Sequence, residues 1–261
     1  MQTTDEPLIL SLETTTRAGS IALTRGAHVL SARTGEAQAD HSTDLLSGVR
    51  AVLNEAGRVI EEIDLFAVAS GPGSFTGLRI GLATVKSFAA TLGRPAIGVP
   101  TLYAIALSAG VSDYTLAMLP AGRGEVFGQL LAVEASGQIR PLTEPVHLPP
   151  RRLLESLDQS RVLKLAGEGV RVYIDLITTY TLERGISLRD AERDSMPVGS
   201  DQIKWVLAPS NENLAAHIAA EALRLFLSGD RGDPLELQAI YVRPSDAELS
   251  EQCLEQNKPA R

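Results

Sequence analysis

The order of secondary-structure elements that the sequence predicts occurs twice, and this repetition constrains the fold more than any other feature. Short apolar runs bounded by polar or glycine-containing turns predict strands, and apolar residues three or four positions apart predict helices. The first half gives strands at 8–12, 19–23, 28–32, 65–70 and 96–99, and helices at 42–56 and 78–92. Such helices must pack against a sheet, so the predicted fold class is α/β.

The second half repeats the order of three strands, a helix, a strand and a helix, although no sequence identity between the halves is visible. Its strands are predicted at 115–119, 125–133, 138–147 and 162–166, and its helices at 151–157 and 170–184. The matching order indicates an old structural duplication.

The remaining chain adds few elements. Residues 190–208 show little periodicity and are predicted to be loop, whereas 210–228 form an amphipathic helix with Ser210 as its cap and Gly229 at its end. Residues 239–242 are predicted to be an edge strand. The polar tail, 246–261, is expected to be mobile.

The duplicated order resembles the actin-like (ASKHA) fold, a duplicated ribonuclease-H-like fold found in actin, sugar kinases and Hsp70. We therefore expect two small domains, residues 1–105 and residues 106–208, with the helix at 210–228 joined to the first. In that fold a nucleotide lies in the cleft between the halves. The fold by itself does not give the function.

The composition excludes several classes of protein. There are 24 basic and 32 acidic residues, a net charge of −8, and most affinity for nucleic acid comes from Lys and Arg on phosphates. Any RNA is therefore expected to be held by another subunit. The single Cys253 excludes a disulfide within the chain, a zinc finger and an iron–sulfur site, and it fits a reducing cytoplasm. We expect no membrane helix and no signal peptide, because no long uncharged apolar run or basic N-terminal segment occurs.

The histidines give no pattern typical of catalysis or metal binding. His28, His41, His147 and His217 form no H-x-x-x-H or H-E-x-x-H pair. No Ser–His–Asp or Cys–His arrangement can be argued either. The sequence therefore predicts no catalytic residue and no metal site.

Two polar segments are candidates for contact with a nucleotide or an ion. Glu13 and Thr14 follow the first strand, where a carboxylate and hydroxyls can face Mg²⁺ and phosphate, or can form a polar turn. Gly71, Gly73 and Ser74 belong to a glycine-rich loop whose amides open onto a helix N-terminus. This loop is either an anion cradle or a plain strand-to-helix turn, since it lacks the Gly-Lys-Ser/Thr of a Walker A loop.

The helix at 78–92 carries only two charges, Arg79 and Lys86, so we expect it to be buried on more than one side. The covering surface is either the rest of this chain or a partner. Gly77 and Gly81 would leave a shallow notch for another helix, and the helix at 42–56 is expected to lie alongside. The predicted partner surface comprises Ser42, Leu45, Leu46, Val49, Gly77, Leu78, Ile80, Gly81 and Thr84.

Several segments together resemble one protein family. They are 9–16 (ILSLETTT), 19–23 (GSIAL), 41–46 (HSTDLL), 71–81 (GPGSFTGLRIG) and 98–102 (GVPTL), with looser matches at 124–127 and 241–243. In these segments the sequence is similar to the TsaB (YeaZ) family. The resemblance is dense over residues 8–105 and thin over 130–235, and the glycine-rich segment is its most specific part.

The resemblance implies a cytoplasmic bacterial protein with the actin-like fold and no catalytic role or cofactor of its own. TsaB proteins take part in making threonylcarbamoyladenosine next to the anticodon of tRNAs that read codons beginning with A. The implied partners are the catalytic subunit TsaD, which packs against the first-domain helices, and the ATPase TsaE. ATP or ADP and tRNA would be bound only in the complex. An uncovered apolar face would be a liability, so we expect a homodimer through the same face when the chain is alone.

The sequence departs from the family at two places, and alternatives depend on them. The carboxylate after the first strand, often Asp, is Glu13, and the usual Asp-Ala-Arg-Arg-Gly-Glu-Val-Tyr is replaced by 120–127 (PAGRGEVF). An ATP-dependent phosphotransferase would need acidic residues at both strand ends, but the second position is Pro120. A catalytic, metal-dependent paralogue such as TsaD would need the paired histidines that this chain lacks.

Overall fold

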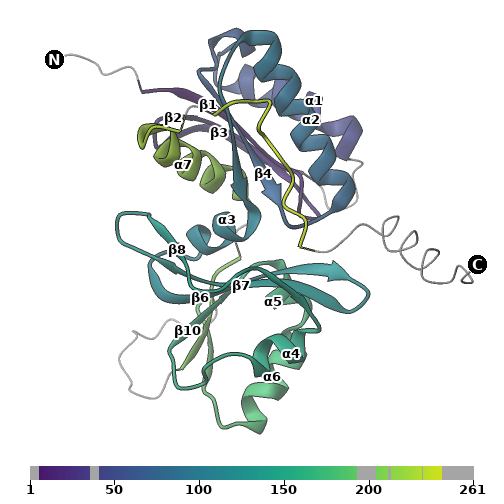
Figure 1. Cartoon of the computed structure of the whole chain (residues 1–261), viewed down its shortest axis with the longest axis vertical. Coiled ribbons are helices and arrows are strands. Elements are labelled where there is room, and N and C mark those ends of the chain that lie inside the picture. The colour runs from purple at the N-terminus through teal and green to yellow at the C-terminus, as the bar shows by residue number, and fades with distance from the viewer. Residues whose placement is uncertain (1–5, 36–40, 193–203, 211–212, 231, 243–261) are drawn as a thin grey trace, which may run out of the picture.

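Two β-sheets, one above the other in Figure 1, organise the chain, and helices cover their faces. The computed structural model describes residues 6–35, 41–192, 204–210, 213–230 and 232–242. The predicted α/β class is confirmed.

The first sheet has the strand order β3-β2-β1-β4-β5. Its strands β1, β2 and β3 are antiparallel neighbours, whereas β4 and β5 continue from β1 in parallel. The strands are β1 (Leu8–Glu13), β2 (Ser20–Arg25), β3 (His28–Thr34), β4 (Leu65–Gly71) and β5 (Ala96–Pro100).

Alternation along β1 directs helices to both faces of the first sheet. Leu8, Leu10 and Leu12 share a core with α1 (His41–Glu55) and α2 (Phe75–Leu92). Ile9 lies instead in the core that contains α7 (Leu214–Leu227). Successive side chains of a strand point to opposite faces, so α1 and α2 cover one face and α7 the other (Figure 1).

Hydroxyl groups dock α7 onto its face of the sheet. Ser11 Oγ donates to the Ala215 carbonyl at 2.7 Å and also lies 3.1 Å from the Ala22 carbonyl oxygen. The Ala215 amide donates to Ser20 Oγ at 3.0 Å. Both peptide groups of Ala215 are therefore satisfied by strand side chains, which explains why serines occur inside buried strands.

The second sheet has the order β11-β12-β10-β6-β7-β8, and β9 also pairs with β7. Around β6 the pattern matches that around β1: one antiparallel side and one parallel side. The predicted duplication of ribonuclease-H-like order is confirmed. The strands are β6 (Ser112–Gly122), β7 (Glu125–Val133), β8 (Ile139–Pro141), β9 (Val146–Leu148), β10 (Leu163–Ala166), β11 (Leu188–Asp190) and β12 (Trp205–Leu207).

Helices again cover both faces of the second sheet. Leu116 and Met118 of β6 pack in a core with residues of α4 (Pro150–Glu155) and α6 (Ile174–Glu183). Ala117 and Leu119 face the other way, toward α3 (Thr101–Ser108). The short α5 (Glu168–Val172) follows β10. Because the core around α3 also holds α7 and residues of the first sheet, one apolar core connects the two sheets.

Several predicted elements are wrong in extent or type. Helix α3 was not predicted, because its sequence is apolar on every side and gives no amphipathic pattern. The predicted strand at 138–147 is two short strands, β8 and β9, and the predicted helix at 170–184 is divided at Tyr173 into α5 and α6. The predicted loop at 190–208 contains β12.

The ends of other elements also differ from prediction. Helix α2 begins at Phe75 because Ser74 Oγ accepts the Gly77 amide, and α7 begins at Leu214 with Asn213, not Ser210, as its cap. Residues 239–242 are not a strand, although the Ile240 amide donates to the Ser70 carbonyl at 2.7 Å. The predicted tail, 246–261, lies outside the described residues.

Candidate functional site

The carboxylate of Glu13 is buried and is held by its own turn. Its Oε1 accepts hydrogen bonds from the Thr15 amide (2.5 Å), the Thr15 hydroxyl (2.6 Å) and the Thr16 amide (2.8 Å). Its Oε2 accepts the Thr16 hydroxyl at 2.5 Å. Four donors within three residues make this carboxylate the anchor of the turn after β1. Contact between Glu13 and a nucleotide or ion stays a prediction.

The glycine-rich loop at 71–77 lies between the turn after β1 and the segment at 239–242. The Ser74 amide donates to the Thr15 carbonyl at 2.8 Å. A Cβ on Gly73 would lie 2.6 Å from Thr15 Cβ, and one on Gly71 would lie 2.7 Å from the Ile240 carbonyl oxygen. Gly71 also has a φ of +104°. The glycines therefore permit close approach of the chain itself, and binding of an anion at Gly71, Gly73 and Ser74 stays a prediction.

The notch predicted at Gly77 and Gly81 does not face outward. A Cβ on Gly77 would lie 1.8 Å from the Thr14 carbonyl oxygen, and one on Gly81 would lie 2.3 Å from Thr14 Oγ1. Thr14 Oγ1 also donates to the Gly77 carbonyl at 2.7 Å. The prediction of an open notch is wrong, because the turn after β1 fills it.

The other predicted partner residues divide by exposure. Leu45, Val49 and Leu78 are buried in the core beneath α1 and α2. Leu46 is 57% exposed, while Ile80 and Thr84 are half-buried on α2, and Ser42 lies in the first turn of α1. Helices α1 and α2 lie side by side, as predicted (Figure 1). Partner contact at the accessible positions stays a prediction.

An aromatic and cationic cluster at the start of α2 was not singled out from the sequence. The rings of Phe75 and Tyr241 lie 5.6 Å apart, and the Arg79 guanidinium carbon lies 3.9 Å from the centre of the Phe75 ring. Phe75 is 37% exposed and Tyr241 is 50% exposed. Phe75 and Arg79 lie in the family-like segment at 71–81, and Tyr241 lies in the one at 241–243. The resemblance of both segments to the family could have indicated this cluster.

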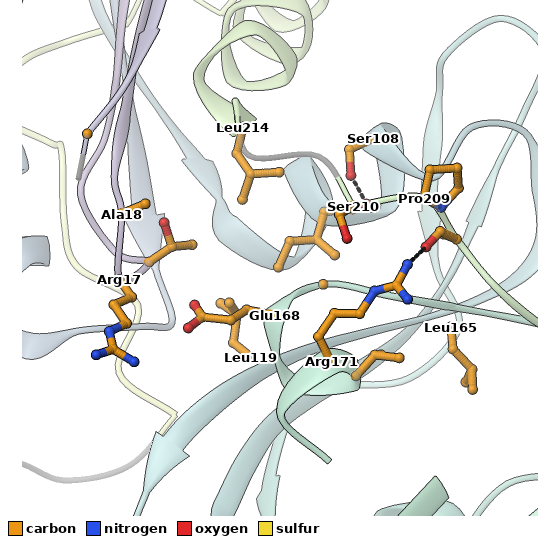
Figure 2. Close-up of a pocket in the computed structure, with 16 residues that line it drawn as sticks. Arg17, Ala18, Ser108, Leu119, Leu165, Glu168, Arg171, Pro209, Ser210 and Leu214 are labelled. Atoms are coloured by element: carbon orange, nitrogen blue, oxygen red, sulfur yellow. Dashed lines mark hydrogen bonds between the residues drawn. The ribbon is translucent and has the colours of Figure 1, made fainter. Parts of the chain in front are cut away.

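A cleft of about 420 Å³ lies between the turn after β1 and the start of α5. The fold resemblance predicted a nucleotide in the cleft between the halves, but none of the residues proposed for nucleotide or ion contact lines this cleft. Figure 2 shows Leu214 entering from α7, Arg17 at one side and Glu168 in the centre. The lining residues are Thr16, Arg17, Ala18, Gly35, Ile105, Ser108, Leu119, Leu165, Gly167, Glu168, Val170, Arg171, Ala208, Pro209, Ser210 and Leu214.

The charged groups of the cleft differ in how they are paired. Arg171 Nη2 donates to the Ala208 carbonyl at 2.8 Å, and its guanidinium lies 3.3 Å from Asp190 and 3.5 Å from Glu192. Arg17 also has an interaction of its own. In the described part of the chain, the Glu168 carboxylate receives no hydrogen bond and no ion pair.

The described residues give no grouping of three or more His, Cys, Asp and Glu side chains suited to a metal ion. Among the helices of those residues, none is both long and apolar enough to cross a membrane.

Comparison with known proteins relates the whole chain to one family. The model of the family "TsaD: tRNA N6-adenosine threonylcarbamoyltransferase" matches residues 33–225. The tRNA threonylcarbamoyladenosine biosynthesis protein TsaB of Escherichia coli is 31% identical over 239 residues, which cover 90% of this chain and 94% of that protein. The tRNA N6-adenosine threonylcarbamoyltransferase of Erythrobacter litoralis is 34% identical over 41% of this chain and 31% of its own length.

A solved structure shows the same fold. YeaZ from Pseudomonas aeruginosa superposes with a TM-score of 0.69 and 24% identity, covering 90% of this chain and 99% of YeaZ. The actin-like fold is thus confirmed by structure as well as by strand order. On the full-length match to the Escherichia coli protein and the match to the family model, this chain belongs to the TsaB (YeaZ) branch of the family that the TsaD model describes.

Proposed function

We propose that this chain is the non-catalytic partner subunit of a complex that forms threonylcarbamoyladenosine in tRNA. The observation that carries the proposal is the 31% identity to Escherichia coli TsaB across nearly all of both chains. The chain would act by pairing with a TsaD-type subunit that transfers the threonylcarbamoyl group. A TsaE-type ATPase, ATP or ADP, and tRNA would be bound only in that complex, in the cytoplasm.

The turn after β1 supports a role without a reacting group. The Glu13 carboxylate is committed to four hydrogen bonds from its own turn. In the second half, the strand that corresponds to β1 carries Pro120 near its end, opposite Val126. A phosphotransferase would need a carboxylate at each of these strand ends. Here the Glu13 carboxylate is already hydrogen-bonded within its own turn, and the second strand has Pro120 in place of a carboxylate.

We propose the outer surface of α1 and α2 as the face that binds the TsaD-type subunit. Leu46 is the exposed large apolar residue of α1, and Ile80 and Thr84 are accessible on α2. Phe75, Arg79 and Tyr241 extend this surface at the start of α2. Aromatic and arginine side chains are enriched among residues that dominate binding energy. We name these six residues the α1–α2 face. The isolated chain would form a homodimer through this face, so the two assemblies would exclude each other.

The two proposed domains correspond to the two sheets. We infer a partner-binding domain of residues 1–105 with 210–228, and a second domain of residues 106–208. The packing of α7 against β1 and β2 supports its grouping with the first sheet.

The test is reconstitution of the modification with and without this chain. The mixture contains a TsaD-type and a TsaE-type subunit, ATP, threonylcarbamoyl adenylate and unmodified tRNA, and mass spectrometry measures the modified adenosine. We expect modification to depend on the chain and to decrease when Leu46→Asp weakens pairing. Modification at the same rate without the chain would contradict the proposal, as would ATP hydrolysis at kinase-like rates by the chain alone.

A further inference from the structure

Helix α2 carries two positive charges and no negative one. Arg79 is exposed and Lys86 is half-buried, and the seven residues from one to the other place them on one stripe of the helix. The exposed residue between them on this stripe is the small Ala83. In the described part of the chain, neither cation pairs with a carboxylate. This side of α2 can therefore accept a segment that supplies carboxylates.

Residues 232–242 bring the chain to the start of α2. Leu237 is buried in the core beneath α1 and α2. Tyr241 packs on Phe75, and its hydroxyl lies 3.5 Å from Arg79 Nε. The chain after residue 242 therefore starts beside the first cation of the stripe. It also starts near the positive end of the α2 dipole, where the first turn contains no acidic residue.

The sequence that follows is acidic. Residues 246–255 (DAELSEQCLE), which lie outside the described ranges, contain four carboxylates and no basic residue. Leu249 and Leu254 lie among these carboxylates, so the segment combines negative charge with apolar side chains. Nine residues of chain span at most about 30 Å, and positions 79 and 86 are about 10 Å apart along the helix axis. The segment is therefore long enough to reach both cations.

We propose that residues 246–255 bind across α2 of the same chain, with their carboxylates toward Arg79 and Lys86, and cover the α1–α2 face when no partner is bound. The docking itself does not depend on the proposed function. Its consequence does: the segment would compete with the TsaD-type subunit, and with a second copy of the chain, for this face.

The test uses Cys253, the single cysteine of the chain, which lies within the acidic segment. A nitroxide attached to this thiol broadens the NMR signals of amides that lie close to it. In the full chain at low salt, we expect the amides of α2 to lose intensity and those of α6 to keep it. Raising the salt concentration should restore the α2 signals, because salt screens attraction between exposed charges.

Two charge variants of the full chain show whether ionic attraction holds the segment. The first replaces the four carboxylates of 246–255 by the corresponding amides. The second is Arg79→Gln combined with Lys86→Gln. Each should reduce the broadening of the α2 signals at least about twofold, because the energy of the ionic contacts is lost.

Each variant has a matched control with the same change in net charge. The control for the first neutralises four exposed carboxylates of the second half: Asp113, Glu134, Glu144 and Asp175. The control for the second is Arg140→Gln with Arg152→Gln, which are exposed cations of that half. Both controls should retain the broadening on α2.

Three results would overturn the proposal. One is the absence of broadening on α2 in the labelled full chain at low salt, and another is broadening that both charge variants leave unchanged. The third comes from a mixture of spin-labelled chain and isotope-labelled chain without a nitroxide. Equal broadening in this mixture would mean that the segment binds a second copy and not its own chain.

Affinity for the TsaD-type subunit tests the consequence. If the segment covers the face in about four of five molecules, the full chain binds the subunit about fivefold more weakly than the variant without the four carboxylates. Calorimetric titration measures both affinities. Broadening on α2 with unchanged affinity would support the docking of the segment and contradict the α1–α2 face as the partner surface.

Discussion

The turns that follow β1 and β6 occupy corresponding places in the two halves, but the first is packed against a helix and the second is not. After β1, the segment from Thr14 to Gly19 folds onto the start of α2 and is locked by Glu13. After β6, Gly122 and Gly124 form a tight hairpin, and a Cβ at either position would meet nothing within 4 Å. Two strands in corresponding positions are thus followed by different turns: the one after β1 is packed against α2, and the one after β6 is open.

The comparison separates two uses of glycine. Gly122 and Gly124 have φ values of +76° and +80°, so they serve the conformation of the hairpin. Gly77 and Gly81 lie inside a right-handed helix and serve close approach of Thr14. A glycine-rich sequence that looks like an anion cradle can therefore be a packing device.

Gly77→Ala tests most directly whether the turn after β1 is closed by packing and the hairpin after β6 is open. The new Cβ would lie 1.8 Å from the Thr14 carbonyl oxygen, a backbone atom that cannot move alone. We expect a loss in unfolding free energy above the ~1–3 kcal/mol usual for overpacking. Gly122→Ala, which strains only a hairpin, should cost about 1 kcal/mol. Urea denaturation measures both, and equal midpoints for Gly77→Ala and the parent would show that the turn is not closed by packing.

Replacing Glu13 by Ala tests the lock on the closed turn. Its removal leaves the backbone amides of Thr15 and Thr16 without this acceptor, whereas the Thr15 hydroxyl keeps the Thr101 hydroxyl as a partner, so we expect a loss of about 3 kcal/mol in unfolding free energy. Glu125→Ala is the counterpart in the open turn. Glu125 is partly exposed and lies 2.9 Å from His147 Nε2, so its loss should cost less than about 1 kcal/mol.

The same variant separates a structural role from a catalytic one. At a temperature where the Glu13→Ala protein stays folded, we expect it to pair with the TsaD-type subunit and to support modification. Intact folding and pairing with abolished modification would mean that Glu13 takes part in the reaction.

Local sequence was enough to predict most of the fold, because amphipathic helices keep a period of 3.6 residues and fully buried strands such as β1 and β4 stand out as short apolar runs between turns. Helix α3 was missed since it lies in the core between the sheets and is apolar all round. Strand β12 was missed because three residues, Trp205–Leu207, are too few to show alternation.

The candidate site was less predictable, because its contacts join distant parts of the chain. The pattern Gly77-x-x-x-Gly81 shows that something approaches α2 closely, but it cannot show that the neighbour is Thr14. The cleft joins the turn after β1, the start of α5 and Leu214, and no single segment of sequence contains this arrangement.

Leu46→Asp tests whether a partner subunit binds the α1–α2 face. This face is exposed, whereas the turn after β1 is covered by the chain itself. Leu46 is 57% exposed, so the change should leave the melting temperature near that of the parent. Burying the new charge against a TsaD-type subunit should weaken association about tenfold to a hundredfold, equivalent to ~1.4–2.8 kcal/mol.

Leu182→Asp is the matched control for that experiment, since Leu182 is 75% exposed on α6 of the other half. Calorimetric titration measures both affinities. Unchanged affinity for Leu46→Asp, with the protein folded, would place the interface elsewhere. The oligomeric state of the isolated variant, measured by analytical ultracentrifugation, tests whether the homodimer uses the same face.

The smallest expected effect concerns His217 on α7, the helix between the two sheets. Burial lowers the pKa of His217 below its ordinary value of 6.5. The folded protein therefore holds this side chain neutral at pH values where the unfolded chain already binds a proton. As the pH falls below about 6.5, unfolding takes up a proton and the free energy of unfolding decreases, until the pH reaches the pKa of the folded state. His217→Gln should remove this part of the pH dependence, whereas the exposed His28→Gln should retain it. Urea denaturation at a series of pH values between about 5 and 8 measures the slope. An unchanged slope in His217→Gln would show that the packing of α7 between the sheets does not depend on a neutral imidazole.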